Sequence, residues 1–441
     1  MNKEKWMRRA LDLGIESFEI YQSISKNKEV TWYQGQMDTF VSSVVNGTSI
    51  RGIVDGNMAN LALEVVDDAS MDTVLQGLIE QAKLVSTQEK DQLRKPEPFE
   101  PVTSDVKWVK PSMEALTSCF QQVESKCLQY DPRIVQVANL VWQEAYGQRE
   151  ITNTLGLHVQ DADQAQYFAV ALVASENGQS KIEQEIEIIH DLNDFDIDAF
   201  VKKLCDKVLA RLGSTSLPSQ KTPVILEKGA MTDLLSAFMG MFNGELIHKG
   251  ISPIAQSLNE TIFSSLVTLV DDPRCKEALS IASFDDEGCP TRKKVLVDQG
   301  VFKTILHDTK SAMRMQTEST GNGFKSGYAS GVSVHPMNAY IQPGTRSLDD
   351  LCETMENGLV ITDLQGLHAG INFVSADFSL QCEGYWVKDG KRAQSVSLIT
   401  IADNFLELMK KVVEVGNDLE WSYHQVVSPS ILFKDCSISG E

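Results

Sequence analysis

The sequence has no Cys-x-x-Cys pair, although eight cysteines are present, at positions 119, 127, 205, 275, 289, 352, 382 and 436. Scattered cysteines lack the ligand spacing of a cysteine-rich zinc module, and they argue against a disulfide framework. We therefore expect reduced thiols in a cytoplasmic protein, most of them packed as small core residues.

Long apolar runs are also missing. No stretch approaches the roughly 20 apolar residues that a membrane-spanning helix needs. The first residues include basic side chains but no apolar signal segment with a small-residue cleavage site. The sequence therefore predicts neither a membrane span nor a secretory signal.

Clusters of positive charge are absent as well. The chain has 40 Lys and Arg against 61 Asp and Glu, a formal net charge of -21. Proteins that bind nucleic acid directly concentrate Lys and Arg on one face. The densest basic segment here, residues 388–392, is typical of a solvated hairpin tip. Direct nucleic-acid binding is therefore not expected.

Two catalytic or phosphate-binding motifs are lacking. No Gly-x-Ser-x-Gly segment is present, so His335 and the serines at 319 and 326 do not indicate a serine hydrolase. The Gly-Asn-Gly at 321–323 is not followed by Gly-Lys-Ser/Thr, so it does not indicate a phosphate-binding loop.

What the sequence does contain is an α+β pattern in a chain too long for one ordinary core. We expect two domains, 1–220 and 221–441, each with helices packed on a curved, mainly antiparallel sheet. The first contains a polar, proline-rich connector near 87–111. Helical periodicity is found at 3–13, 70–86, 112–128, 196–212, 230–248 and 402–414.

Strand signals lie between these helices. Asn46-Gly47, Asp55-Gly56 and Asn177-Gly178 are dipeptides typical of hairpin turns. From 374 to 381 apolar and polar residues alternate, which predicts a sheet with one polar face. An extended peptide could lie beside such a face by strand addition.

The stretch from 284 to 344 is the most distinctive. It opens with the acidic turn Phe-Asp-Asp-Glu-Gly, whose Asp285, Asp286 and Glu287 lack the spaced oxygen ligands of a calcium loop. We expect these acids to cap a turn or to pair with Arg292 and Lys293.

A hairpin is predicted next, bending at residues 298–300. The glycine-dense segment 319–344 follows and is predicted to be a surface loop on a rigid frame.

Together with the Pro-x-Asn at 336–338 and the Gln-Pro-Gly at 342–344, this stretch resembles the TldD/PmbA family, known as modulators of DNA gyrase and peptide-maturation proteases. The resemblance is closer to the PmbA (TldE) branch. In the TldD branch the helix equivalent to 230–248 carries a His-Glu-x-x-x-His zinc motif, and a cysteine precedes the last strand. Here the helix lacks that motif, and residues 421–425 offer no thiol.

The resemblance therefore implies a metal-free subunit of a two-component, zinc-dependent peptidase that acts on unfolded peptides or peptide precursors. No cofactor is expected in this chain, and zinc is expected in a TldD-like partner subunit. One alternative is a homodimeric peptide-binding or scaffold protein without hydrolytic activity. A further alternative is an autonomous metallopeptidase with an atypical site.

An autonomous metallopeptidase would need a metal site built from other residues. Glu245 and His248 are spaced i,i+3 and so could face one way on a helix. They would need a third donor, for which His335, His368 and His424 are available. The competing interpretation is that His248 complements the dipole at the end of the helix.

For peptide binding, the candidates lie in the glycine-rich segment. Gly321 and Gly323 allow close approach of the backbone to a ligand. Asn322 and Asn338 carry amides that can both donate to and accept from a peptide backbone, and His335 lies between them. We expect residues 319–340 to line the substrate cavity.

Overall fold

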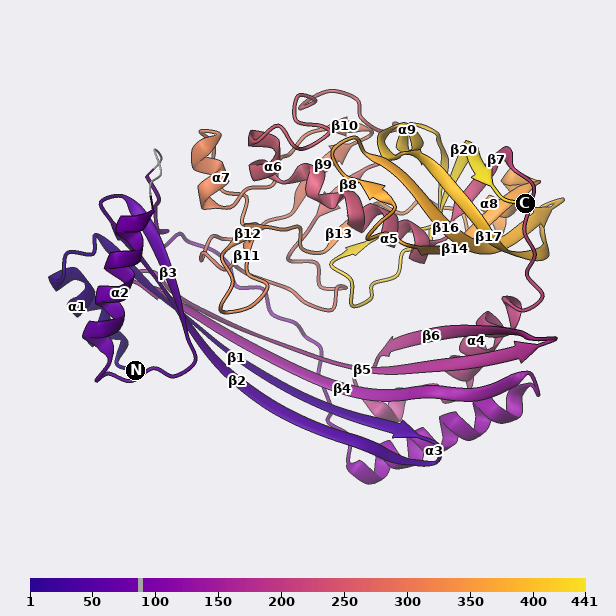
Figure 1. Cartoon of the computed structure of the whole chain (residues 1–441), viewed down its shortest axis with the longest axis horizontal. Coiled ribbons are helices and arrows are strands. Elements are labelled where there is room, and N and C mark those ends of the chain that lie inside the picture. Colours follow the sequence, from indigo (N-terminus) through magenta and orange to yellow (C-terminus); the bar gives the residue numbers. More distant parts are fainter. Residues whose placement is uncertain (86–89) are drawn as a thin grey trace.

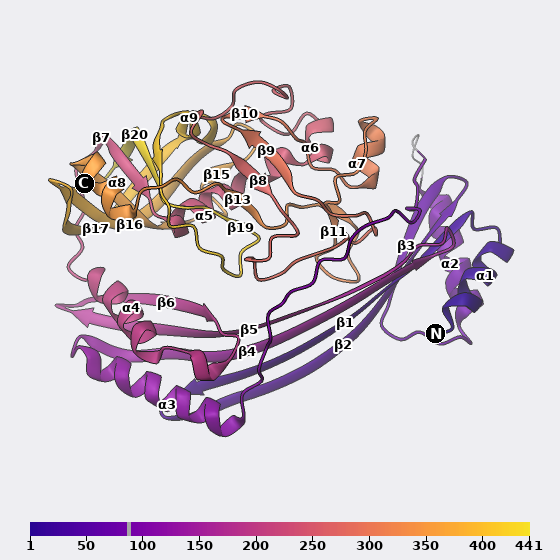
Figure 2. The ribbon, with the colours of Figure 1, turned by 180° about the vertical axis from the view of Figure 1, so that it is seen from behind.

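A computed structural model describes residues 1–85 and 90–441, so residues 87–89 of the expected connector lie outside the described part. The α+β class with mainly antiparallel sheets is confirmed (Figures 1 and 2). The helices are α1 (Lys3–Asp12), α2 (Met71–Leu84), α3 (Met113–Tyr130), α4 (Ile197–Ala210), α5 (Lys228–Phe238), α6 (Gly244–His248), α7 (Thr309–Arg314), α8 (Leu348–Met355) and α9 (Phe405–Lys410).

The first sheet is one long, bent layer with the order β3-β2-β1-β4-β5-β6. Its strands are β1 (Ser17–Tyr33), β2 (Gln36–Val54), β3 (Asn57–Leu63), β4 (Ile134–Asn153), β5 (His158–Glu176) and β6 (Gln179–Ile188). Four of them have 17 to 20 residues, three times the usual strand length. The strands before the proline-rich connector and the strands after it therefore form a single sheet.

Helices cover one face of this sheet at its two ends. Phe18 and Ile20 pack under α1 and α2, while Val30 and Trp32 of the same strand pack under α3 and α4. All four positions are even-numbered, so the alternation of a strand places them on one face. The other face is left for the C-terminal half of the chain, which lies over it (Figure 1).

Two of the three hairpin turns predicted from Asn-Gly and Asp-Gly dipeptides are correct. Asp55-Gly56 joins β2 to β3 and Asn177-Gly178 joins β5 to β6. The prediction at Asn46-Gly47 is wrong, because both residues lie inside β2 and pair with β1. The turn between β1 and β2 is formed instead by Gln34 and Gly35, both with positive φ.

Gly47 has a different role. A Cβ atom placed on it would lie 2.1 Å from the ring of Tyr328, which belongs to the glycine-rich segment. A glycine inside a strand often marks such a close approach of another part of the chain. Gly47 therefore allows the C-terminal half to pack directly on the sheet.

The second half contains a closed sheet with the path β14-β7-β20-β17-β16, completed by pairing of β16 with β14. These strands are β14 (Gly358–Gln365), β7 (Gln220–Leu226), β20 (Ile431–Ser439), β17 (Lys391–Asn404) and β16 (Asp377–Lys388), with β15 (Ile371–Asn372) and β18 (Val412–Val415) beside β16 and β20. The alternation predicted for 374–381 is confirmed from 377 to 381, but residues 374–376 lie in a turn where Val374 is 60% exposed. Strand addition at this segment is not supported, because β16 is already paired on both sides.

The predicted helix 230–248 is interrupted. It divides into α5, a 3-10 turn (Met239–Phe242) and α6, and the side chain of Asn243 caps α6 by accepting from the N–H groups of Glu245 and Leu246. The predicted helix 402–414 is also too long. It shortens to α9 because β17 continues to Asn404, whose side chain caps the helix.

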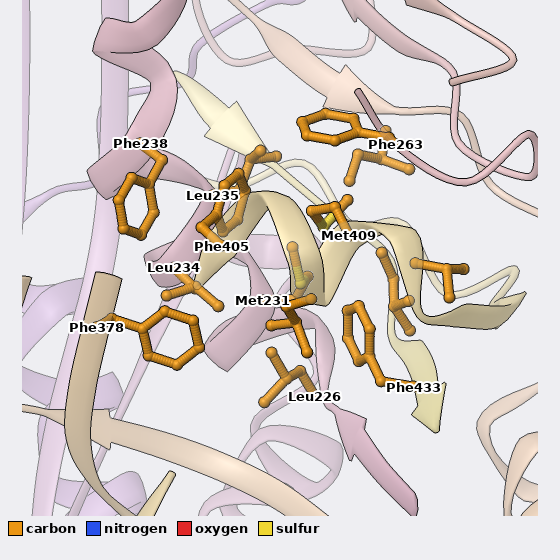
Figure 3. Packing of buried hydrophobic residues seen from close by; sticks show 14 of the residues in the cluster. Leu226, Met231, Leu234, Leu235, Phe238, Phe263, Phe378, Phe405, Met409 and Phe433 are labelled. Atoms are coloured by element: carbon orange, nitrogen blue, oxygen red, sulfur yellow. The ribbon is translucent and has the colours of Figure 1, made fainter. Parts of the chain in front are cut away.

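Apolar packing joins α5 to the closed sheet. Met231, Leu234, Leu235 and Phe238 are buried in one cluster with residues of β7, β16, β20 and α9 (Figure 3). Phe238 stacks on Phe405 with 4.5 Å between ring centroids. The helix at which the family resemblance implies a zinc motif in the TldD branch is here mainly a core helix.

Two smaller sheets complete the fold. One has the order β10-β9-β8-β13-β19, and its strands are β10 (Val301–Phe302), β9 (Lys294–Asp298), β8 (Leu269–Asp271), β13 (Ala339–Ile341) and β19 (Val426–Val427). The other pairs β11 (Gly323–Phe324) with β12 (Ser333–Val334). The predicted hairpin around 298–300 is confirmed by the pairing of β9 with β10.

A glycine substitution tests the packing of Tyr328 on β2. Gly47→Ala should lower the free energy of unfolding by about 1–3 kcal/mol, because the new methyl group overlaps the ring. Gly147→Ala is the matched control, since it lies in β4 with no atom within 4 Å of its added Cβ, and it should be neutral or stabilising by up to about 1 kcal/mol. Urea denaturation measures both, and equal effects would contradict the packing. Adding Tyr328→Ala to Gly47→Ala should remove most of the loss.

Candidate functional site

The acidic turn at 284–288 is buried where the two halves of the chain meet. Asp285 is fully buried, and its carboxylate accepts backbone N–H groups of Glu287, Cys289 and Gly323, each at 2.9 Å. Burial raises the pKa of Asp285, and the neighbouring charge of Glu287 acts in the same direction. Three N–H donors oppose that shift because they stabilise the carboxylate.

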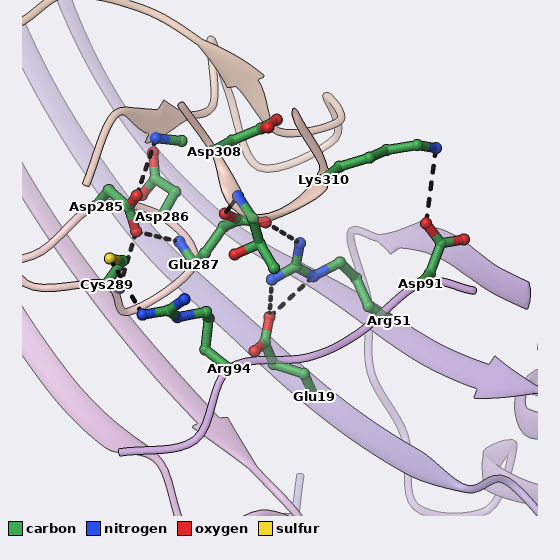
Figure 4. A network of polar contacts seen from close by, with 12 residues as sticks. Glu19, Arg51, Asp91, Arg94, Asp285, Asp286, Glu287, Cys289, Asp308 and Lys310 are labelled. Carbon is green, nitrogen blue, oxygen red and sulfur yellow. Dashed lines mark hydrogen bonds and ion pairs between the residues drawn. The ribbon is translucent and has the colours of Figure 1, made fainter. Parts of the chain in front are cut away.

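The other two acids form ion pairs with the long sheet, and Figure 4 shows the one between Glu287 and Arg51. Asp286 lies 2.7 Å from Arg149 of β4 and accepts the hydroxyl of Tyr21 at 3.1 Å. Glu287 lies 3.6 Å from Arg51 of β2, which also donates to Glu19 at 2.5 Å. The charges are compensated across the junction between the sheet and the C-terminal half.

The expectation that these acids cap a turn is confirmed for Asp285, whereas the predicted partners Arg292 and Lys293 are wrong. Arg292 donates to the carbonyl of Ser319, and Lys293 donates to the hydroxyl of Tyr340. The acids point inward, where Glu287 pairs with Arg51 and Asp286 pairs with Arg149, and both arginines are distant in the sequence. Local sequence could not reveal this pairing.

Four of the five candidate peptide-binding residues lie in the interior. Asn322 has no exposed surface and is saturated: its amide donates to Asp271 at 3.0 Å and to the carbonyl of His335 at 2.9 Å, and its oxygen accepts from Lys294 and Thr320 at 2.8 Å. No atom of this side chain is left for a substrate. The description of the whole segment as a surface loop is wrong for residues 319–323.

The neighbouring candidate residues are also held by contacts inside the fold. A Cβ on Gly321, whose φ is +70°, would lie 2.5 Å from the carbonyl oxygen of Pro290, and one on Gly323 would lie 2.9 Å from Glu287. Asn338 is buried and donates to the carbonyl of Ser280 at 2.7 Å. Glycine is needed here for packing inside the fold.

His335 is the candidate that reaches a cavity. Its side chain is exposed and lies 2.9 Å from the hydroxyl of Ser333. It lines a cavity of about 890 Å³ between the long sheet and the C-terminal half, a volume typical of ligand clefts. Of the residues 319–340 that were expected to line a substrate cavity, 324–328 and 334–337 line this cavity, and its use by a substrate stays a prediction.

The cavity is lined by three groups of residues. The sheet contributes Tyr21, Ser23, Ile24, Ser25, Gly147, Gln148, Arg149, Asp161, Ala162 and Asp163; the region of α5 and α6 contributes Ser236, Met239, Gly240, Asn243 and Leu246; the loops contribute Ser280 to Ala282, Leu306, Phe324 to Tyr328, Val334 to Met337, Gln425 and Val426. The sheet side is largely polar, whereas the opposite side carries most of the apolar groups.

Lys325 is a cavity residue that sequence reasoning did not single out. Its ammonium donates to Ser49 at 2.7 Å and lies over the ring of Tyr21, 4.4 Å from the centroid. Burial lowers the pKa of Lys325 to about 8, with the charge of Arg51 adding to the shift. A lysine in a glycine-dense segment was the available signal, since a glycine-rich loop rarely needs a charged residue for packing.

The residues present do not fit a zinc ion. Glu245 is occupied by Arg314 at 2.5 Å and Lys249 at 2.9 Å, while His248 and His368 are exposed. Among residues 1–85 and 90–441, no three His, Cys, Asp or Glu side chains are placed to hold a metal ion together. The candidate pair Glu245 and His248 therefore lacks a third ligand in the described structure.

Two stretches of the chain match known domain descriptions. Residues 219–440 match the PmbA/TldA metallopeptidase C-terminal domain, and residues 107–212 match the PmbA/TldA metallopeptidase central domain. The chain belongs to the PmbA/TldD family. The division into domains at residue 220 remains a prediction, close to the gap between these two matches.

Relatives of this family resemble the chain over most of its length. The metalloprotease PmbA of Escherichia coli O157:H7 is 26% identical over 73% of this chain and 68% of its own. A crystal structure from Thermotoga maritima, described as a modulator of a DNA gyrase, is 27% identical, covers 99% of both chains and has a TM-score of 0.88.

TldE from Thermococcus kodakarensis, at 24% identity, has a TM-score of 0.90 over 99% of this chain and 100% of its own, which shows a shared fold. Across the described residues, this PmbA/TldD family chain has no helix both long and apolar enough to cross a membrane.

A charge deletion tests the junction of this PmbA/TldD protein. Arg149→Met leaves Asp286 buried without its cation and should cost about 3–5 kcal/mol of unfolding free energy. Arg9→Met, which breaks an exposed and solvent-screened pair with Asp72, should lower the unfolding free energy far less. Denaturant unfolding compares the two, and the double variant Arg149→Met/Asp286→Asn should recover part of the loss. Similar small effects at both sites would contradict the role of the junction.

His307, which supports the buried segment 319–323 through its backbone, gives a pH dependence. Burial lowers the pKa of His307 from 6.5 to about 4. Its neutral form stabilises the fold above pH 6.5, and that contribution, up to about 3 kcal/mol, is lost as pH falls toward 4. Unfolding free energies at pH 7 and 4.5 should differ less in His307→Gln than in the wild type. His158→Gln, at an exposed site, should leave the slope unchanged.

Proposed function

We propose that this chain is the non-catalytic subunit of a two-component peptidase and that it holds an unfolded peptide in the 890 Å³ cavity. The observation that carries the proposal is the composition of the cavity at α5. Ser236, Met239 and Gly240 face the space from the helix region that bears the zinc motif in the TldD branch, and none of them is a usual metal ligand. The zinc and its activated water would come from a TldD-like partner.

The cavity residues suggest how a peptide would be held. The backbone of β1 at Ser23 and Ser25 is paired with both β2 and β4, so a peptide would contact side chains of the sheet instead of adding a strand. On the opposite wall, Met239, Phe324 and Met337 offer apolar contacts. Such a cavity favours unfolded segments that expose apolar residues, since folded proteins bury them.

Two alternative functions differ from this proposal in the partner and the metal site that they require. A peptide-binding homodimer without hydrolytic activity would share the cavity and need no metal-bearing partner. An autonomous metallopeptidase has less support, because Glu245 is engaged by two cations and His248 is exposed.

The proposal is tested with an unstructured, fluorescently labelled peptide and the purified chain. The chain alone should bind the peptide without cleaving it, in the presence or absence of added zinc, and cleavage should begin when a family member bearing His-Glu-x-x-x-His is added. Ser25→Trp, which fills the cavity, should weaken binding at least tenfold. Ser379→Trp, on the exposed side of β16, is the matched control.

Each outcome distinguishes the proposed function from its two alternatives. Unchanged affinity in a folded Ser25→Trp variant would remove the cavity from the site. Binding without cleavage in the mixture would favour the homodimeric peptide binder. Zinc-dependent cleavage by the chain alone, abolished in His248→Ala, would favour the autonomous enzyme.

A further inference from the structure

A second cavity, of about 480 Å³, lies between the β2–β3 end of the long sheet and α7 (Figure 1). Connector residues 90–92 complete its wall, and Lys325 lines both this cavity and the cavity of 890 Å³. Its volume is in the range of sites that hold small molecules. The proposed function leaves this second cavity without a role.

Side chains of both charges line the second cavity. Five of them are lysine or arginine, and the acids are Asp91, Glu287 and Asp308. Figure 4 shows these acids together with Arg51 and with Lys310, which pairs with Asp91 at 3.7 Å. Five cations against three acids leave an excess of two positive charges, in a chain whose net charge is -21. The lining therefore attracts an anionic group and also offers carboxylates to a cationic one.

Two of these cations are close enough to repel each other. Nε and Nη2 of Arg51 donate to Glu19, whereas its Nη1 lies 3.6 Å from Glu287, longer than a hydrogen bond. Lys325 uses two of its three N–H groups, on Ser49 and on a backbone carbonyl. Burial and, after it, the charge of Arg51 lower the pKa of Lys325. A carboxylate near both cations would accept from them and offset their repulsion.

Two buried polar atoms of the cavity wall are left without a partner. The hydroxyl of Thr309, a residue that is only 7% exposed, and the side-chain oxygen of Asn60 have no hydrogen-bond partner within residues 1–85 and 90–441. The backbone N–H of Thr309 donates to Glu287 at 2.7 Å, so the hydroxyl is the group left for a ligand. A hydroxyl can donate to a carboxylate, and an amide oxygen can accept from an ammonium. A ligand that carries both groups would satisfy both atoms.

We propose that the second cavity binds a small zwitterion, either a free amino acid or a short peptide, by both of its charged ends. Its carboxylate would face Arg51, Lys325 and Thr309, and its ammonium would face Asn60 and Asp91. The inference goes beyond the proposed function, because neither the 890 Å³ cavity nor a metal-bearing partner takes part in it.

Strand pairing places the groups for both ends of the ligand in one small space. Asn60 lies directly opposite Arg51 in the pairing of β3 with β2, and Asp91 accepts the N–H of Met58 on β3. The acceptors for an ammonium are therefore neighbours of the donors for a carboxylate, which suits a molecule that carries both charges. The side chains of Met58 and Met313 offer adaptable apolar contacts to the rest of the ligand.

A phosphate group fits this lining less well. Glu287 and Asp308 line the same cavity as Thr309, and they repel a doubly charged anion more than a singly charged one. The backbone N–H groups of Thr309 and Ser311, which a phosphate could use, already donate to Glu287 and Asp308. A singly charged carboxylate is therefore the favoured anion.

Isothermal titration calorimetry of the full chain with the tripeptide Ala-Leu-Ala tests the proposal. The tripeptide should bind, and N-acetylation or C-terminal amidation should each weaken binding at least tenfold, because each removes one charged end. Ser25→Trp fills the 890 Å³ cavity and should leave the affinity for the tripeptide unchanged. Because this variant separates the two cavities, failure here is distinguishable from failure of the proposed function.

Thr309→Val tests the site with almost no change of shape. It removes a hydroxyl that has no partner in the described structure, so the fold should be at least as stable as in the wild type, while the tripeptide should bind at least tenfold more weakly. The affinity for a long unstructured peptide should not change, since Thr309 does not line the 890 Å³ cavity. Thr354→Val, at an exposed position on α8, is the matched control and should alter neither affinity. Urea denaturation checks the stability of both variants.

Leucine, acetate and inorganic phosphate serve as comparison ligands. If leucine binds at least as tightly as the tripeptide, the ligand is a free amino acid; if it binds more weakly, the ligand is a short peptide, and the proposal holds in both cases. Acetate or phosphate that binds as tightly as the tripeptide would overturn recognition of both ends. Absence of binding to the wild type, loss of binding in Ser25→Trp, or unchanged affinity in a folded Thr309→Val variant would remove the second cavity as the site.

Discussion

The compensation of buried carboxylates by arginines of the long sheet holds the two halves of this protein together. Asp286 and Glu287 are buried in one turn, where an unpaired charge would cost several kcal/mol. Arg149 and Arg51 supply the opposite charge from β4 and β2. Because each ion needs its partner, the sheet and the C-terminal half can dock in only one arrangement.

That docking creates the cavity. The same junction places Lys325 against Tyr21 and Ser49, and it brings Tyr328 onto Gly47 of β2. The segment 319–340 is thereby divided by function. Its first residues are a buried support, saturated by hydrogen bonds around Asn322, and its later residues form one wall of the cavity.

The name of the family suggests metal chemistry, whereas the residues that the α5 region places in the cavity do not. The family descriptions name metallopeptidase domains, yet this helix contributes serine, methionine and glycine to the cavity. The helix packs Met231, Leu234 and Phe238 into the core, so it closes the apolar interior of the second half. A shared fold does not by itself determine the chemistry of a site.

Much of the secondary structure was determined by local sequence. The periodicity at 3–13, 70–86, 112–128 and 196–212 produced α1 to α4, and the dipeptides at 55–56 and 177–178 produced turns, because helix periodicity and turn preferences act over a few residues. Tertiary structure decided what depends on distant contacts: Gly47 lies under Tyr328, Asn322 is saturated by Asp271 and Lys294, and the acidic turn pairs with β2 and β4. A glycine or an asparagine has the same local preference in a turn, a loop or an interior, and only the atoms that surround it in the folded chain determine which role it takes.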